Sequence, residues 1–257
     1  MPVRRPPTHP VRRSARRTTV GLALGAALSL GVAAQPSLTA AAGAAAKPSA
    51  VTIRTVGTTV KGAKATTVAV TYRGTDRFVK RSLETAVAAL AAAQLAAFND
   101  AYERPSPSGH AGEYQLTAKL VANASPVMAL EFAEYVDVAG AHPTNGFHAI
   151  ILNSRTGRIW SQREIGEQLD AAAPAGITTL AEVRKAVAAK LPADMRYQAN
   201  TLALADVTLV PTSAGLRVDV DRCVLTCAIG SLETVIGWKR LLAPAGQVDF
   251  VPAIWRR

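Results

Sequence analysis

Two residues, Cys223 and Cys227, carry the most definite chemistry in this 257-residue chain, because they are its only cysteines. Four residues of extended strand would separate their Cα atoms by about 13 Å, whereas a disulfide needs them within about 7 Å. A bond between them therefore requires a turn over residues 224–226, and closing so small a loop contributes about 2 kcal/mol in the chain-entropy model. The spacing is not Cys-x-x-Cys, so we expect a structural disulfide and no redox catalysis.

Two histidines, His142 and His148, are the candidate metal ligands, because imidazole is the commonest metal-binding side chain. On a strand, however, His148 would share a face with the apolar Ile150 and Leu152. No cysteine or carboxylate stands at a recognisable ligand spacing from the two histidines. We expect no metal site and no other cofactor.

Paired acids would be the natural catalysts of polysaccharide hydrolysis, which needs two carboxylates flanking the scissile bond. Glu131 and Glu134 are close in sequence, but three positions apart on a strand they face opposite sides. Glu134 acting with a distant acid stays open as an alternative. No nucleophile elbow, phosphate loop or dinucleotide fingerprint is present, so the sequence favours a protein that is not an enzyme.

The segment 140–146, Gly-Ala-His-Pro-Thr-Asn-Gly, is the candidate ligand-binding loop. Glycines at both ends give backbone freedom, and the proline fixes the chain after the histidine. One interpretation is that this loop presents Gly140, His142, Pro143 and Asn145 to a ligand. The other is that His142 bonds to neighbouring backbone groups in a tight structural connection.

Alternating apolar residues predict the strands that would hold these side chains. The expected strands are 51–60, 66–72, 114–121, 127–138, 147–152, 204–210, 216–220 and 233–238. Helical spacing predicts a helix from Arg77, capped by Asp76, and two more helices beginning at the capping boxes Ser161-x-x-Glu164 and Thr179-x-x-Glu182. Because strands and helices are segregated, we predict a single α+β domain over residues 51–257, with an antiparallel sheet and helices packed on one face.

The N-terminal residues have the order of a secretory signal peptide. Six arginines and no acid stand within the first 17 residues, and an apolar run of about 15 residues follows, too short for a membrane span of about 20. We predict cleavage after Ala34, export by the Sec or the twin-arginine route, and a flexible Ala-rich leader over 35–50. The product would be secreted, with no stable membrane span after cleavage, and either free or retained at the cell wall.

The net charge of the chain limits the classes of partner that it can favour. The formal charge is +11, and removal of the six N-terminal arginines lowers it to +5. This balance is compatible with an anionic wall polymer or an envelope protein, whereas a basic run interleaved with aromatic residues, as nucleic-acid binding would favour, is missing.

Several motifs in order resemble the RsiV-like domain of unknown function. They are Tyr135 to Pro143 with Gly-Ala-His, then Phe147 and Ile150, Thr156-Gly157-Arg158-Ile159, Gly215-Leu216-Arg217-Val218, and Cys223-x-x-x-Cys227. Relatives of that family include extracytoplasmic parts of lysozyme-sensing anti-sigma factors, accessory domains beside peptidoglycan deacetylases and secreted mycobacterial antigens. The resemblance implies a binding module, although lysozymes are themselves basic and a chain of charge near +5 would meet them with like sign.

The sequence therefore predicts a secreted, bacterial, non-enzymatic binding domain of the cell envelope. The alternative is a peptidoglycan-acting or polysaccharide-acting hydrolase or deacetylase of unrecognised type.

Overall fold

A computed structural model describes residues 51–102, 109, 111–139, 142–225, 227 and 229–256. The predicted signal peptide (1–34) and leader (35–50) lie outside the described residues, as do Gly140 and Ala141 of the candidate loop.

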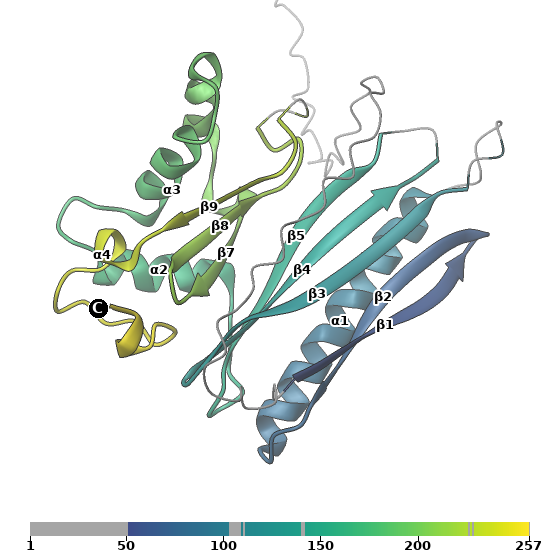
Figure 1. The fold of residues 1–257 in the computed structure, drawn as a ribbon, viewed down its shortest axis with the longest axis horizontal. Helices are drawn as coiled ribbons and strands as arrows, with labels where there is room; N and C mark the ends of the chain where they lie inside the picture. The colour runs from purple at the N-terminus through teal and green to yellow at the C-terminus, as the bar shows by residue number, and fades with distance from the viewer. Residues whose placement is uncertain are drawn as a thin grey trace, which may run out of the picture.

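The larger part of the fold is a six-stranded sheet with the strands in sequence order (Figure 1). Its strands are β1 (Val51–Val60), β2 (Ala63–Tyr72), β3 (Glu113–Ala124), β4 (Val127–Asp137), β5 (Thr144–Asn153) and β6 (Ile159–Trp160). All neighbours pair antiparallel except β2 and β3, which are parallel. The parallel pair follows from the crossover helix α1 (Arg77–Ala101) between these two strands.

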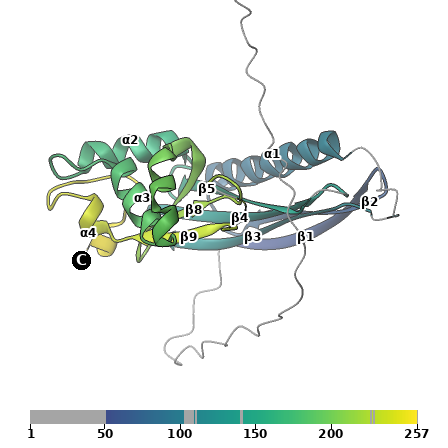
Figure 2. The same cartoon turned by 90° about the horizontal axis from the view of Figure 1, so that it is seen from above.

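Helix α1 lies lengthwise along one face of this sheet (Figure 2). The carboxylate of Asp76 caps it by accepting hydrogen bonds from the backbone N–H groups of Phe78 and Val79. Its buried residues, among them Leu83 and Phe98, recur at helical spacing and pack against the sheet.

A second sheet of three antiparallel strands lies beside β5 (Figure 1). It consists of β7 (Val207–Thr212), β8 (Gly215–Val220) and β9 (Leu232–Ile236). Around it are α2 (Gln162–Ala172), α3 (Thr179–Ala188), α4 (Trp238–Leu241) and three 3₁₀ segments, Ala193–Thr201, Leu204–Asp206 and Ala253–Arg256.

Strands β3 to β5 separate two apolar cores, because successive side chains of a strand point to opposite faces. Met128, Leu130 and Phe132 of β4 face α1 and belong to what we call the α1 core. Val127 and Ala129 of the same strand face β7, β8, α2 and α3 and belong to what we call the inter-sheet core. The middle of the large sheet is thus covered on both sides.

The predicted α+β class is confirmed, and the sheet organisation adds two features to it. The last three strands form a sheet of their own, and a parallel pair lies inside the larger sheet. The predicted cap of α3 was wrong by one residue, because Thr178 is the N-cap and its hydroxyl accepts from the backbone N–H of Ala181. Across the described parts of the chain, none of the helices combines the length and the apolar character that a membrane crossing needs.

Candidate functional site

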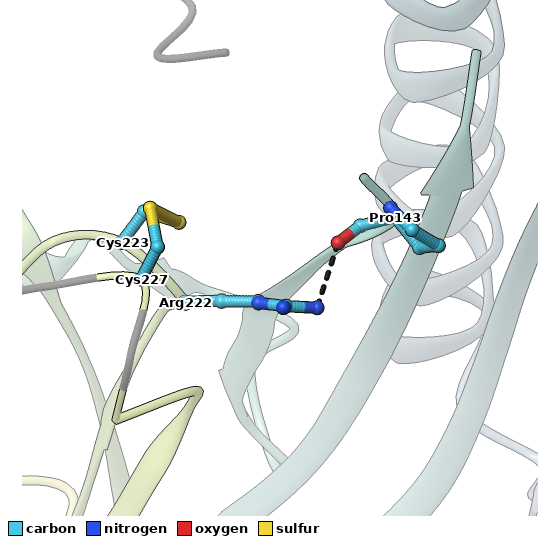
Figure 3. The surroundings of a disulfide bond; sticks show 4 residues. All are labelled: Pro143, Arg222, Cys223 and Cys227. Carbon is cyan, nitrogen blue, oxygen red and sulfur yellow. Dashed lines mark hydrogen bonds between the residues drawn. A yellow bond between two sulfur atoms is a disulfide. The ribbon is translucent and has the colours of Figure 1, made fainter. Parts of the chain in front are cut away.

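The candidate loop and the two cysteines lie together, although about 80 residues separate them in sequence. Pro143 precedes β5 directly, and Asn145 is the second residue of that strand. The segment between β8 and β9 carries both cysteines and lies against this entry to β5 (Figure 3).

The predicted disulfide between Cys223 and Cys227 is present, with the two Cα atoms 3.9 Å apart. The predicted bend begins where the backbone N–H of Val224 donates to the carbonyl of Asp221 at 3.2 Å. Thr226 lies outside the described residues. We call the residues 221–230 the disulfide loop.

Arg222 is the main link between the disulfide loop and the entry to β5. One guanidinium nitrogen, Nη1, donates to the carbonyl of Pro143 at 2.8 Å (Figure 3). Its backbone N–H donates to the carbonyl of Asn145 at 3.3 Å. Two backbone oxygens of the predicted loop are therefore already hydrogen-bonded within the protein.

Asp221 and Thr208 bond to the backbone of Phe147, two residues beyond Asn145 on β5. The carboxylate Oδ1 of Asp221 accepts from the backbone N–H of Phe147 at 2.7 Å, and the hydroxyl of Thr208 donates to the carbonyl of Phe147 at 2.9 Å. An edge strand with open backbone groups would otherwise be available for pairing at this position. The disulfide loop and β7 together cover this part of the β5 edge.

A small cluster of titratable groups lies directly behind this contact. Nε2 of His148 is 3.3 Å from Oε2 of Glu134, and both side chains are largely buried. A Cβ placed on Gly146 would come within 3.2 Å of Oε2 of Glu134 and 3.7 Å of Oδ2 of Asp221. The glycine therefore leaves the space between two carboxylates unfilled.

Burial and the charge of Glu134 raise the pKa values of two groups here, Asp221 and Tyr114. Burial raises the pKa of Asp221, with the hydrogen bond from Phe147 and the charge of His148 opposing the rise and the charge of Glu134 adding to it. Burial, followed by the charge of Glu134, raises the pKa of the Tyr114 phenol above its ordinary range. Both shifts favour the protonated forms of Asp221 and Tyr114.

A hollow of about 260 Å³ lies on the face of the large sheet opposite α1, next to the disulfide loop. Its floor consists of two rows of cross-strand neighbours, Gln115–Tyr135–Asn145 and Thr117–Ala133–Phe147. Glu134, Gly146 and Ser231 complete the lining. We call it the β3–β5 groove.

A second hollow, of about 360 Å³, lies on the other side of the β5 entry. It is lined by Phe147, His148, Gln162, Leu204, Ala205, Asp206, Val207, Thr208, Asp221 and Val224. Much of its polar surface is engaged within the protein, because Gln162 exchanges side-chain hydrogen bonds with the backbone of Leu209 and Asp206 accepts from the backbone N–H of Ala203.

Buried charges close the β3–β5 groove at its inner end. The next row of the floor contains Lys119 and Glu131, whose Nζ and Oε1 atoms are 3.1 Å apart. Glu131 also forms an ion pair with Arg217 of β8, and Nε of Arg217 donates to Asp219 at 3.3 Å. Glu131, Arg217 and Asp219 are 3%, 7% and 0% exposed, so this network is part of the packing between the two sheets.

The register confirms that Glu131 and Glu134 face opposite sides of β4. Glu131 contacts Arg217 in the inter-sheet layer, whereas Glu134 contacts His148. His142 is half-buried, and within the described residues no three His, Cys, Asp or Glu side chains are grouped as a metal would need.

Sequence reasoning missed the residues that build the junction, namely Arg217, Asp219, Asp221, Arg222 and Thr208. One signal was present in the alternation of Arg217, Asp219 and Asp221 with the apolar Leu216, Val218 and Val220. In a strand that is buried on both faces, such charges must meet partners across an interface. Nothing local indicates which partners they meet.

Comparison with known proteins gives a likeness of fold. No family model matches the chain, and no curated protein sequence matches it. A solved DUF3298 family protein from Pseudomonas aeruginosa PAO1 has a TM-score of 0.52 and 14% identity, over 76% of this chain and 95% of that one. A DUF3298 family member from Bacteroides fragilis NCTC 9343 has a TM-score of 0.47 and 10% identity, over 73% and 90% of the two chains.

The first of these likenesses shows a shared fold, that of an uncharacterised domain. At this level of identity it transfers no site or activity. The resemblance to the RsiV-like domain stays a prediction from the sequence motifs.

Proposed function

We propose that this protein is an exported, non-enzymatic binding domain that recognises a ligand of the cell envelope through the β3–β5 groove. The observation that carries the proposal is the groove itself, an open hollow of polar and aromatic side chains on a sheet with an apolar core packed on each face. Ligand sites typically combine such surfaces with a few placed polar groups.

The disulfide supports a location outside the cytoplasm, since such bonds persist in oxidising compartments. It agrees with the signal peptide predicted from residues 1–34. The bond also closes the loop whose Arg222 holds Pro143 and Asn145 at the entry to β5, and Asn145 lines the groove.

The partner we propose is an envelope protein or a wall polymer. Lysozyme stays disfavoured by the like sign of its charge. Nucleic acid is disfavoured as well, because the groove lining contains no Lys or Arg to contact phosphates.

Retention on isolated envelope material tests this proposal. We expect the exported protein to be retained, and Arg222→Ala to weaken retention because the disulfide loop loses its bond to Pro143. Arg163→Ala is the matched control, since it removes the same charge from an exposed position on α2. Equal retention of all three proteins, or none for any, would count against the proposal.

Polysaccharide hydrolysis is the second candidate function, and one observation favours it. Glu134 and Asp221 both approach Gly146, and Asp221 has the raised pKa expected of a general acid. Against it, Asp221 accepts from Phe147 and Glu134 contacts His148, so both carboxylates have structural partners.

Release of soluble products from purified peptidoglycan would decide between the two functions. We expect no turnover by the wild-type protein. Turnover that is abolished in Glu134→Gln and kept in Glu167→Gln, an exposed acid on α2, would establish the enzyme instead.

A further inference from the structure

We infer that the β3–β5 groove binds an uncharged saccharide unit. This inference rests on the proposed binding function and names the chemical class of its ligand. It departs from the anionic wall polymer that the net charge of the chain suggests.

Charge is the first reason. Among the groove-lining residues Glu134 is the only charged one, and none of them is a Lys or Arg. The nearby cations are engaged, because Lys119 contacts Glu131 and Arg222 donates to Pro143. The Glu134 side chain itself points to the α1 face, where it contacts His148. An anionic ligand would therefore meet no cation among the groove-lining residues, which disfavours it.

The floor provides the second reason. Tyr135 and Phe147 are diagonal neighbours on the same face of β4 and β5, so the floor presents two aromatic side chains at adjoining positions. Ala133 and Thr117, beside Phe147 in its row, are small and leave the space above them open. A sugar ring has apolar C–H faces that suit such an aromatic and aliphatic floor, as in most ligand pockets.

Polar groups beside the aromatic rings provide the third reason. Gln115 and Asn145 flank Tyr135 in the same row, and each amide can both donate and accept hydrogen bonds. Gln115 is held in place by its Nε2, which donates to Glu113 at 2.9 Å. Burial, followed by the charges of Asp137 and Glu113, raises the pKa of the Tyr135 phenol and keeps it a donor. Neutral donors and acceptors around an aromatic ring match hydroxyl and acetamido groups.

The backbone argues against an extended peptide as the ligand. Strand β4 is paired on both sides, and the exposed edge of β5 is covered at Phe147 by Asp221 and Thr208. At the groove a peptide could not add as a strand, which is the usual source of affinity for an extended chain on a sheet. Recognition must therefore come from side chains on the face of the sheet.

Titration of the exported, disulfide-bonded protein with three oligosaccharides tests the inference. The probes are tri-N-acetylchitotriose and maltotriose, which are neutral, and a hyaluronan tetrasaccharide, which is anionic. We expect saturable binding of at least one neutral probe at millimolar concentration or below, weaker binding of hyaluronan, and a loss of at least tenfold in affinity in Tyr135→Ala. Phe78→Ala, which removes an aromatic ring 62% exposed on α1, should leave affinity unchanged.

A second variant, Asn145→Ala, keeps the test informative if the loss of Tyr135 disturbs the sheet, and it should weaken neutral binding as well. Absence of binding by both neutral probes, preference for hyaluronan, or unchanged affinity in folded Tyr135→Ala and Asn145→Ala would each overturn the inference. Envelope retention that persists without oligosaccharide binding would refute only the inference that the ligand is a saccharide. Loss of both envelope retention and oligosaccharide binding would also refute the proposed binding function.

Discussion

Three buried charged residues, Glu131, Arg217 and Asp219, link the two sheets at the closed end of the groove. Removing one partner of such a network leaves an uncompensated buried charge, which typically costs about 3–5 kcal/mol. The network also includes the exposed Glu233, whose Oε1 is 3.9 Å from Nη1 of Arg217. Acids therefore outnumber bases here, because Lys119 and Arg217 face three carboxylates.

Because the acids of this network outnumber its bases, Asp219 should make the free energy of unfolding depend on pH. Burial outweighs its ion pair with Arg217 and raises its pKa from 3.8 to about 6. The folded state therefore binds more protons than the unfolded state across this window, so the free energy of unfolding falls as pH rises and levels off above pH 6.

The free energy of unfolding of Asp219→Asn should lack this part of the pH dependence. Its size is of the order of 2–3 kcal/mol, at about 1.4 kcal/mol per pKa unit for the rise from 3.8 to about 6. Urea denaturation at several pH values from 4 to 7 would measure it. The control Asp249→Asn, at an exposed position, should retain the wild-type pH dependence. Parallel curves for Asp219→Asn and wild type would show that Asp219 does not titrate in this range.

At the scale of elements, the disulfide loop acts as a clamp on the first residues of β5. Its contacts with Pro143, Asn145 and Phe147 all come from Asp221 and Arg222, directly before Cys223. The disulfide closes the loop immediately after these two residues. Closing the loop with the disulfide therefore helps to hold the first residues of β5 in place.

Replacing both cysteines by serine should loosen this clamp without unfolding the domain. The chain-entropy model gives a loss of about 2 kcal/mol for so small a loop. Through local opening at the β5 entry, hydrogen exchange should accelerate more at the amide of Phe147, which donates to Asp221, than in the middle of α1, for example at Val87. Mass spectrometry of peptides covering residues 143–148 and 83–91 would measure both. Unchanged exchange at Phe147 would mean that Arg222 and Asp221 hold β5 without help from the bond.

At the scale of the whole molecule, the sequence predicted the elements that depend on residues close together in the chain. The first hairpin, the Asp76 cap of α1, the Ser161 capping box and the turn closed by the disulfide are all present, because each depends on residues within a few positions of one another. The separate second sheet was not predicted, because alternation shows that a segment is a strand without showing which sheet it joins.

The candidate site was predicted only as separate pieces. The loop before β5 and the cysteine pair each drew attention by their residue types. Their contact depends on Arg222 and Pro143, which are 79 residues apart, and on Asp221 and Phe147, which are 74 apart. The groove floor likewise depends on the register of three strands, which brings Gln115, Tyr135 and Asn145 into one row.

The shared strands make the two cores one cooperative unit, and tryptophan fluorescence can test this. Trp160 and Trp238 are buried in the inter-sheet core and Trp255 packs against it, so all three tryptophans of the chain report on that core alone. Leu83 of α1 is fully buried in the α1 core. Because Ile150 and Ile151 of β5 belong to different cores, loss of one core should remove the support of the other.

Leu83→Ala should therefore lower the denaturation midpoint seen by tryptophan fluorescence, although no tryptophan lies in the core that it damages. The expected loss is about 2–5 kcal/mol, the usual cost of truncating a buried leucine. Far-UV circular dichroism should give the same midpoint if unfolding is two-state. Phe78→Ala, exposed on the same helix, should shift neither signal. An unchanged fluorescence midpoint beside an earlier loss of helix would instead mean that the two sheets fold independently, because β3 to β5 would then keep the inter-sheet core intact without α1.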